Sequence, residues 1–200
     1  MKKGYFLVFV FVLILLDQFL KIWTFSNKED ILFNSDWWWD SVPFFNITYL
    51  ENPGMAFGLL KSSGSFVKFL LTFFRLFAVF FMFFYVFYKY SSFSNFSLLV
   101  LGLLVAGAAG NCVDSVFYES FNLNVVDVGG GLFSGNVIDM FQVSFFPPVF
   151  NLADSYITIG CVLGLIFYKN LSKAVFCVDF DCGSGFLKNL VFYNIMAELN

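Results

Sequence analysis

The chain contains four apolar stretches, each long enough to cross the hydrocarbon core of a bilayer. A helix needs about 20 residues to span roughly 30 Å of hydrocarbon. Hydrophobic residues make up 60% of the 200-residue chain and charged residues only 12%, a balance far from that of soluble proteins. We therefore predict a mainly α-helical membrane protein with four transmembrane helices, over about residues 4–25, 66–88, 96–114 and 152–169.

The distribution of Lys sets the predicted orientation of these helices. The connection after the first stretch holds more acids than lysines, and the connection after the third holds neither Lys nor Arg. Because positive charge is retained on the cytoplasmic side, we expect both termini in the cytoplasm and the two long connections outside. The lysines predicted to be cytoplasmic are Lys2, Lys3, Lys89, Lys169, Lys173 and Lys188.

The residues that the sequence lacks narrow its chemistry. The chain has no His, which excludes Ser-His-Asp and Cys-His catalysis and removes the commonest zinc ligand. Its four Cys do not cluster, so we expect no metal site and no cofactor. The net charge of −3 argues against a nucleic-acid partner, because no basic stripe is available to bind phosphates.

Two carboxylates, Asp139 and Asp154, lie within the apolar run from Gly135 to Gly160. Ionisable groups beside a membrane are costly and usually serve a function. Asn151 is a favoured N-cap and would place Asp154 in the first turn of the last helix, but capping does not explain Asp139. Two carboxylates held close share a proton, so that one activates water while the other protonates a leaving group. We hypothesise an aspartyl dyad at a membrane surface.

Further polar residues lie in the first and third stretches. Asp17 and Lys21 are four residues apart and share a helix face. They either neutralise each other or form a bundle-facing polar patch available to a substrate. Asn111 and Asp114 are three residues apart at the end of the third stretch, so they either support the site by hydrogen bonds or merely mark the helix end.

A small sheet is predicted in the first long connection. The run Phe44–Leu50 is rich in β-branched and aromatic residues and leads into Asn52-Pro53-Gly54, a turn sequence. The preceding Trp37-Trp38-Trp39 triplet stands beside acids and is typical of an interfacial aromatic belt. We expect a sheet that rests on the outer leaflet, with an interfacial segment before it.

At these residues the chain resembles the lipoprotein signal peptidase (signal peptidase II) family of membrane aspartyl peptidases. Any one matching motif is weak, but five in the same order and topological position are strong. The motifs are Asp17-Gln18-x-x-Lys21; Asn46 through Asn52-x-Gly54-x-Ala56-Phe57-Gly58; Gly107-x-x-Gly110-Asn111-x-x-Asp114; Gly135-x-Val137-x-Asp139-Met140; and Phe150-Asn151-x-Ala153-Asp154.

The resemblance implies a single peptidase domain over residues 1–171, with four membrane helices and an extracytoplasmic β-cradle, in a bacterial inner membrane. It implies an endopeptidase that removes the signal peptide from a prolipoprotein, cutting before a diacylglyceryl-modified Cys. The implied partners are that substrate and membrane lipid, and we expect a monomer. Asp139 and Asp154 correspond to the catalytic pair. The residues that correspond to substrate-binding or site-ordering positions are Asp17, Lys21, Asn52, Gly54, Asn111, Asp114 and Asn151.

The sequence departs from the family pattern at two places. The pattern continues with Arg after Asp114, where this chain has Ser115. The connection over residues 117–134 is longer than usual and brings in Asp127 as a rival for the first catalytic position. We prefer Asp139, because the preceding Gly135 and the following Met140 match the family. Residues 172–200 lie outside the resemblance and are predicted to form a cytoplasmic tail without an assigned role.

A function of a different class stays open at this point. The alternative is a small non-enzymatic membrane protein, such as a transporter subunit or a scaffold, that uses the same carboxylates to transfer protons or to pair helices. Proton-carrying acids in such proteins typically lie in mid-membrane along a path. Here the acids are predicted near the outer boundary, which favours the peptidase.

Overall fold

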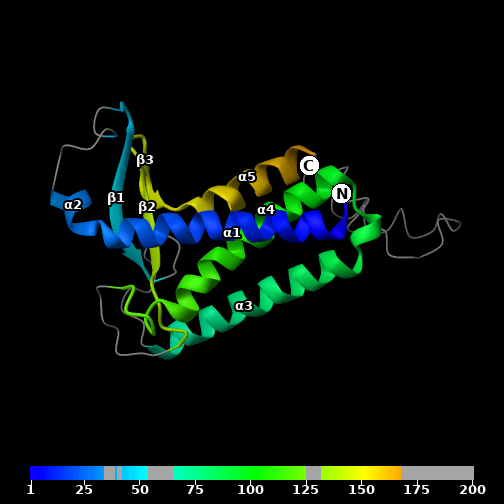
Figure 1. Ribbon diagram of the computed structural model, residues 1–200, viewed down its shortest axis with the longest axis horizontal. Helices are drawn as coiled ribbons and strands as arrows, with labels where there is room; N and C mark the ends of the chain where they lie inside the picture. The colour runs from blue at the N-terminus through cyan, green and yellow to red at the C-terminus, as the bar shows by residue number, and fades with distance from the viewer. Residues whose placement is uncertain (34–38, 40–41, 54–64, 125–131, 168–200) are drawn as a thin grey trace, which may run out of the picture.

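The computed structural model describes residues 1–33, 39, 42–53, 65–124 and 132–167. A helical bundle carries a small antiparallel sheet at one end, and the N-terminus lies at the other end (Figure 1). The elements in chain order are α1 (Lys3–Ser26), α2 (Lys28–Phe33), β1 (Phe45–Asn52), α3 (Ser65–Tyr88), a 3-10 turn (Tyr90–Ser92), α4 (Asn95–Phe117), β2 (Val137–Val143), β3 (Phe146–Phe150) and α5 (Leu152–Ile166).

Helix α4 lies at the centre of the bundle and contacts α1, α3 and α5. It is the most buried of the long helices because its sequence is rich in small residues, which allow helices to approach closely in lipid. At Gly107 a side chain would collide with the carbonyl oxygen of Ala153 in α5 and with Ile157. The close packing of α4 on α5 therefore fixes the first turn of α5, where Asp154 lies.

The sheet has the strand order β1-β2-β3, with both pairs antiparallel. Pro147 and Pro148 lie in β3, which is tolerated because β3 is an edge strand. The middle strand, β2, carries Asp139, and its neighbour β1 pairs Leu50 with Asp139 and Asn52 with Val137. The short sequence between β3 and α5 then brings the start of α5 beside β2.

The predicted mainly helical fold with a small sheet is confirmed, and three of the predicted spans match long apolar helices. Within the described residues, α1, α3 from Phe69 and α4 are long and apolar enough to cross a membrane. Helix α5 is apolar but has only 15 residues before the described chain ends at residue 167. The fourth span, and with it the four-span count, stays a prediction.

Several predicted features lie outside the described residues: Trp37, Trp38, Gly54, Asp127 and the tail from residue 172. Trp39 is described and does not face outward as an interfacial belt would require. It is buried, 3% exposed, with its ring 6.0 Å from the ring of Trp23 in an edge-to-face arrangement. At this position the aromatic side chain packs inside the protein.

Candidate active site

The first turn of α5 is closed by a reciprocal cap. The Asp154 backbone N–H donates to Asn151 Oδ1 at 2.9 Å, and the Asn151 backbone N–H donates to Asp154 Oδ2 at 3.3 Å. Asn151 has an extended backbone, as an N-cap residue requires. This local sequence therefore fixes the position of the Asp154 carboxylate at the positive end of a helix.

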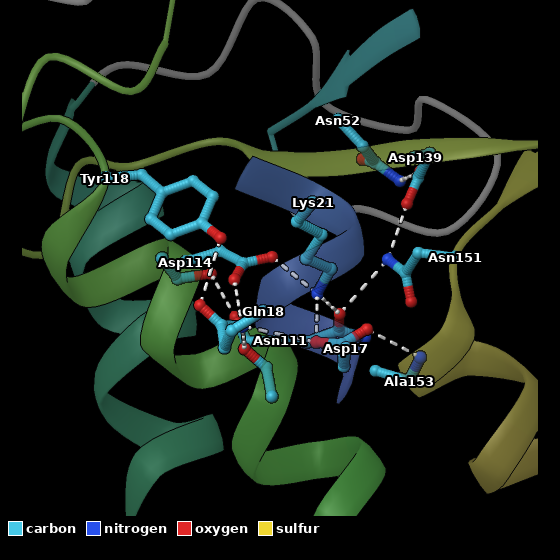
Figure 2. A network of polar contacts seen from close by, with 12 residues as sticks. Asp17, Gln18, Lys21, Asn52, Asn111, Asp114, Tyr118, Asp139, Asn151 and Ala153 are labelled. Atoms are coloured by element: carbon cyan, nitrogen blue, oxygen red, sulfur yellow. Dashed lines mark hydrogen bonds and ion pairs between the residues drawn. The ribbon is translucent and has the colours of Figure 1, made fainter. Parts of the chain in front are cut away.

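Asp139 lies in β2 and is 1% exposed. Its Oδ2 accepts a hydrogen bond from Asn52 Nδ2 at 3.0 Å, and its Oδ1 accepts one from Asn151 Nδ2 at 2.6 Å (Figure 2). Asn52 reaches Asp139 because it lies diagonally across the β1–β2 ladder, two residues beyond Leu50. A strand and a helix start thus hold Asp139 from two sides.

Asn111 of α4 connects this pair to the helical bundle. Its Nδ2 donates to Asp154 Oδ1 at 2.8 Å, and its Oδ1 accepts from Asn151 Nδ2 at 3.1 Å. All four carboxylate oxygens of Asp139 and Asp154 therefore accept hydrogen bonds from uncharged amides, and Asn151 contacts both residues. Amides orient the two carboxylates without neutralising them.

Both carboxylates line one cavity of about 840 Å³ between the sheet and the helices. Burial and, to a smaller degree, the nearby charge of Asp154 raise the pKa of Asp139 to about 7, although the amides of Asn52 and Asn151 act in the opposite direction. A carboxyl group with a pKa near neutrality exchanges protons at physiological pH. The remaining lining is mostly apolar, from residues that include Val143, Phe146, Phe150, Ile157 and Ile159.

A second acidic cluster lies immediately behind the cavity. Lys21 Nζ is 2.8 Å from Asp17 Oδ2, 2.6 Å from Asp114 Oδ2 and 2.9 Å from Asn111 Oδ1, and Asp17, Lys21 and Asp114 are all 0% exposed. The structure thus favours the neutralising role of Asp17 and Lys21, since a substrate cannot reach them. Asp17 Oδ1 also accepts from the Ala153 backbone N–H at 2.9 Å, so the cluster holds the first turn of α5.

The sequence had not indicated three further contacts. Gln18 Nε2 donates to Asp114 Oδ1 at 2.8 Å, and Gln18 Oε1 accepts from the Tyr118 hydroxyl at 3.0 Å. Arg75 of α3 lines the cavity and donates to Ser115 Oγ at 3.4 Å. Two signals for these contacts were present in the sequence: Gln18 directly follows Asp17, and Arg75 is a cation within an apolar stretch.

Of the nine residues singled out in the sequence, eight lie together around the cavity and the buried cluster. Asp139, Asp154, Asn52 and Asn111 line the cavity, and Asn151 joins the two carboxylates. Asp17, Lys21 and Asp114 form the cluster behind it. Gly54 lies outside the described residues.

Comparisons with known proteins agree on one family. The family described as signal peptidase (SPase) II matches residues 9–169. The chain is 32% identical to the lipoprotein signal peptidase of Porphyromonas gingivalis, over 80% of each chain. It is also 32% identical to that of Thermodesulfovibrio yellowstonii, over 82% of this chain and 92% of the relative. A solved structure described as a bacterial membrane enzyme superposes with a TM-score of 0.57 at 26% identity, covering 85% of this chain and 91% of the other.

Proposed function

The chain belongs to the signal peptidase II family, and we propose that Asp139 and Asp154 are the carboxylate pair with which it cuts its substrate. It is a membrane protease that removes the signal peptide from prolipoproteins, before the lipid-modified Cys. The non-enzymatic alternative is not favoured, because the family match spans most of the chain. The observation that carries the assignment is that Asn151 donates to one carboxylate and caps the other at the wall of a single cavity.

The proposed reaction divides the work between the two carboxylates. The Asp154 carboxylate, in the first turn of α5, takes a proton from water as the water oxygen bonds to the substrate's carbonyl carbon. Asp139 has a raised pKa and donates its proton to the leaving amide nitrogen as the C–N bond breaks. The products are a carboxylic acid and an amine, and the proton gained by Asp154 restores the pair.

The cavity supports a substrate that comes from the bilayer. Its apolar walls lie beside α5, so the acyl chains of a diacylglyceryl group can stay in lipid while the peptide reaches the carboxylates. We further propose that both termini lie in the cytoplasm and that the sheet and the cavity face the extracytoplasmic side. This orientation rests on the distribution of Lys.

The test is cleavage of a diacylglyceryl-modified precursor by purified protein in detergent. Asp139→Asn and Asp154→Asn are each expected to lower kcat by at least about 10³-fold, because one carboxyl group alone cannot act as both acid and base. The unmodified precursor should stay intact.

Asp127→Asn is the matched control, since it makes the same change at the rival position in the sequence. It is expected to keep kcat within about threefold of the parent. A dead Asp127→Asn protein together with an active Asp139→Asn protein would overturn the assignment. Melting temperatures of all variants in detergent separate loss of chemistry from loss of fold.

A further inference from the structure

Arg75 is the only arginine in the chain, and it lies inside a membrane-spanning helix. It is about 9 Å along α3 from Phe69, where the apolar span begins. The nearest charged residues in the sequence are Lys68 and Lys89. A guanidinium stays charged at all physiological pH values and is costly to place in hydrocarbon, so such a residue faces a partner or a polar cavity.

The structure shows which cavity Arg75 faces. It is partly exposed and lines the same 840 Å³ cavity as Asp139 and Asp154. Its Nη1 donates to Ser115 Oγ at 3.4 Å, and Ser115 Oγ donates to the Asn111 carbonyl at 3.0 Å. Arg75 is therefore anchored to α4 one turn from the amide that holds Asp154.

A cationic side chain in the cavity would supply hydrogen-bond donors to a bound peptide. Lys21 is sealed between two carboxylates with no exposed surface, so it offers no charge to a ligand. Among the described residues that line the cavity, Arg75 is the one cationic side chain. A peptide that enters between apolar walls brings carbonyl oxygens that need donors, and the planar guanidinium fork supplies several in fixed directions.

The family pattern described above continues with Arg after Asp114, where this chain has Ser115. The side chain at that position now accepts a hydrogen bond from Arg75. We propose that Arg75 is a substrate-binding residue, whose guanidinium donates from α3 to carbonyl oxygens of the prolipoprotein beside the bond that is cut. Arg75 thus places a guanidinium beside Ser115, from α3, where the family pattern has an Arg on the third span itself. The inference rests on the proposed catalytic pair.

The test measures KM and kcat separately with the lipid-modified precursor. Arg75→Gln is expected to raise KM by about 10- to 100-fold, the effect of losing a charged hydrogen bond, and to leave kcat within about threefold. Arg75→Lys keeps the charge but not the fork and is expected to lie between the parent and Arg75→Gln. In the Arg75→Gln/Ser115→Arg double variant, KM is expected to fall at least about fivefold below that of Arg75→Gln.

Lys89→Gln is the matched control, because it removes one cation just beyond the end of α3, away from the cavity. Its KM should equal that of the parent. An unchanged KM in Arg75→Gln, or a double variant no better than Arg75→Gln, overturns the proposal. So does an Arg75→Gln protein whose kcat falls at constant KM or whose melting temperature falls with its activity. A wrong assignment of the catalytic pair gives a different result, because the Asp139→Asn and Asp154→Asn proteins would then keep the full kcat of the parent.

Discussion

Two acidic clusters lie side by side in this protein, and they are stabilised in opposite ways. In the buried cluster, Asp17 and Asp114 share the ammonium group of Lys21 and have no exposed surface. In the cavity, Asp139 and Asp154 are held by uncharged amides. Asn111 contacts both clusters: it accepts from Lys21, which lies beside it in Figure 2, and it donates to Asp154.

This difference separates a structural role from a chemical one. A carboxylate that is paired with a cation in a sealed site has no exposed surface, so it exchanges no protons with a substrate. A carboxylate held by amides beside a second carboxylate keeps its orientation but has a raised pKa, as Asp139 does. The sealed cluster therefore supplies rigidity to the site, and the amide-held pair is suited to proton transfer.

The largest effect is expected from breaking the charge balance of the sealed cluster. Lys21→Met leaves Asp17 and Asp114 buried without a cation, which should destabilise the fold by about 3–5 kcal/mol. The measurement is unfolding in detergent. Lys28→Met is the matched control, since the half-buried Lys28 contacts the ring of Phe25 and should change stability by less than about 1 kcal/mol. Equal stability of the two variants would show that the cluster needs no compensating charge.

An intermediate effect is expected at Asn151, which has two separable tasks. Asn151→Ser keeps an N-cap oxygen but removes the amide that donates to Asp139, so stability should be nearly unchanged while kcat falls about tenfold. Asn151→Ala removes both and should also lose about 1 kcal/mol of stability. Parallel melting curves and turnover numbers check this. If the Ser variant turned over like the parent, the amide would have no part in orienting Asp139.

The smallest effect is a shift in the pH profile. Asn52 donates to Asp139 and so favours its anion, which partly offsets the burial that raises the pKa of Asp139 to about 7. Because the proposed mechanism needs Asp139 protonated, kcat should fall as pH rises through about 7. Asn52→Ala removes the donor, so the pKa rises and the alkaline fall should move to higher pH by less than about one pH unit.

Asn46→Ala is the matched control for this shift, because Asn46 is exposed on the same strand, opposite Gln142. Its pH profile of kcat should overlay that of the parent. A fall in kcat at alkaline pH that moves to lower pH in Asn52→Ala would contradict the proposed direction of proton transfer.

The parts of the site that depend on local sequence were predictable. The cap by Asn151 and the position of Asp154 at the third helical residue are confirmed. Both could be predicted because they depend on only four consecutive residues. The shared face of Asn111 and Asp114 follows from helical periodicity, and both side chains do make inward contacts.

The contacts that depend on packing were not predictable. The bond from Asn52 to Asp139 needs the register of two strands separated by more than eighty residues, and a single sequence does not specify that register. The third partner of the Asp17–Lys21 pair, Asp114, depends on how α1 packs against α4. The place of Arg75 likewise depends on the rotation of α3 against the bundle.

The packing around Gly135 limits which sequence changes this protein can accept during evolution. The Gly135 N–H donates to the Ser115 carbonyl at 3.0 Å, and a side chain there would collide with the Asp114 carbonyl oxygen. The chain between Val116 and Phe133, which also share a backbone hydrogen bond, thus leaves α4 and returns to it at a fixed point. The start of β2 is thereby held against the end of α4. Position 135 is therefore closed to sequence drift, because any larger residue would displace the strand that carries Asp139.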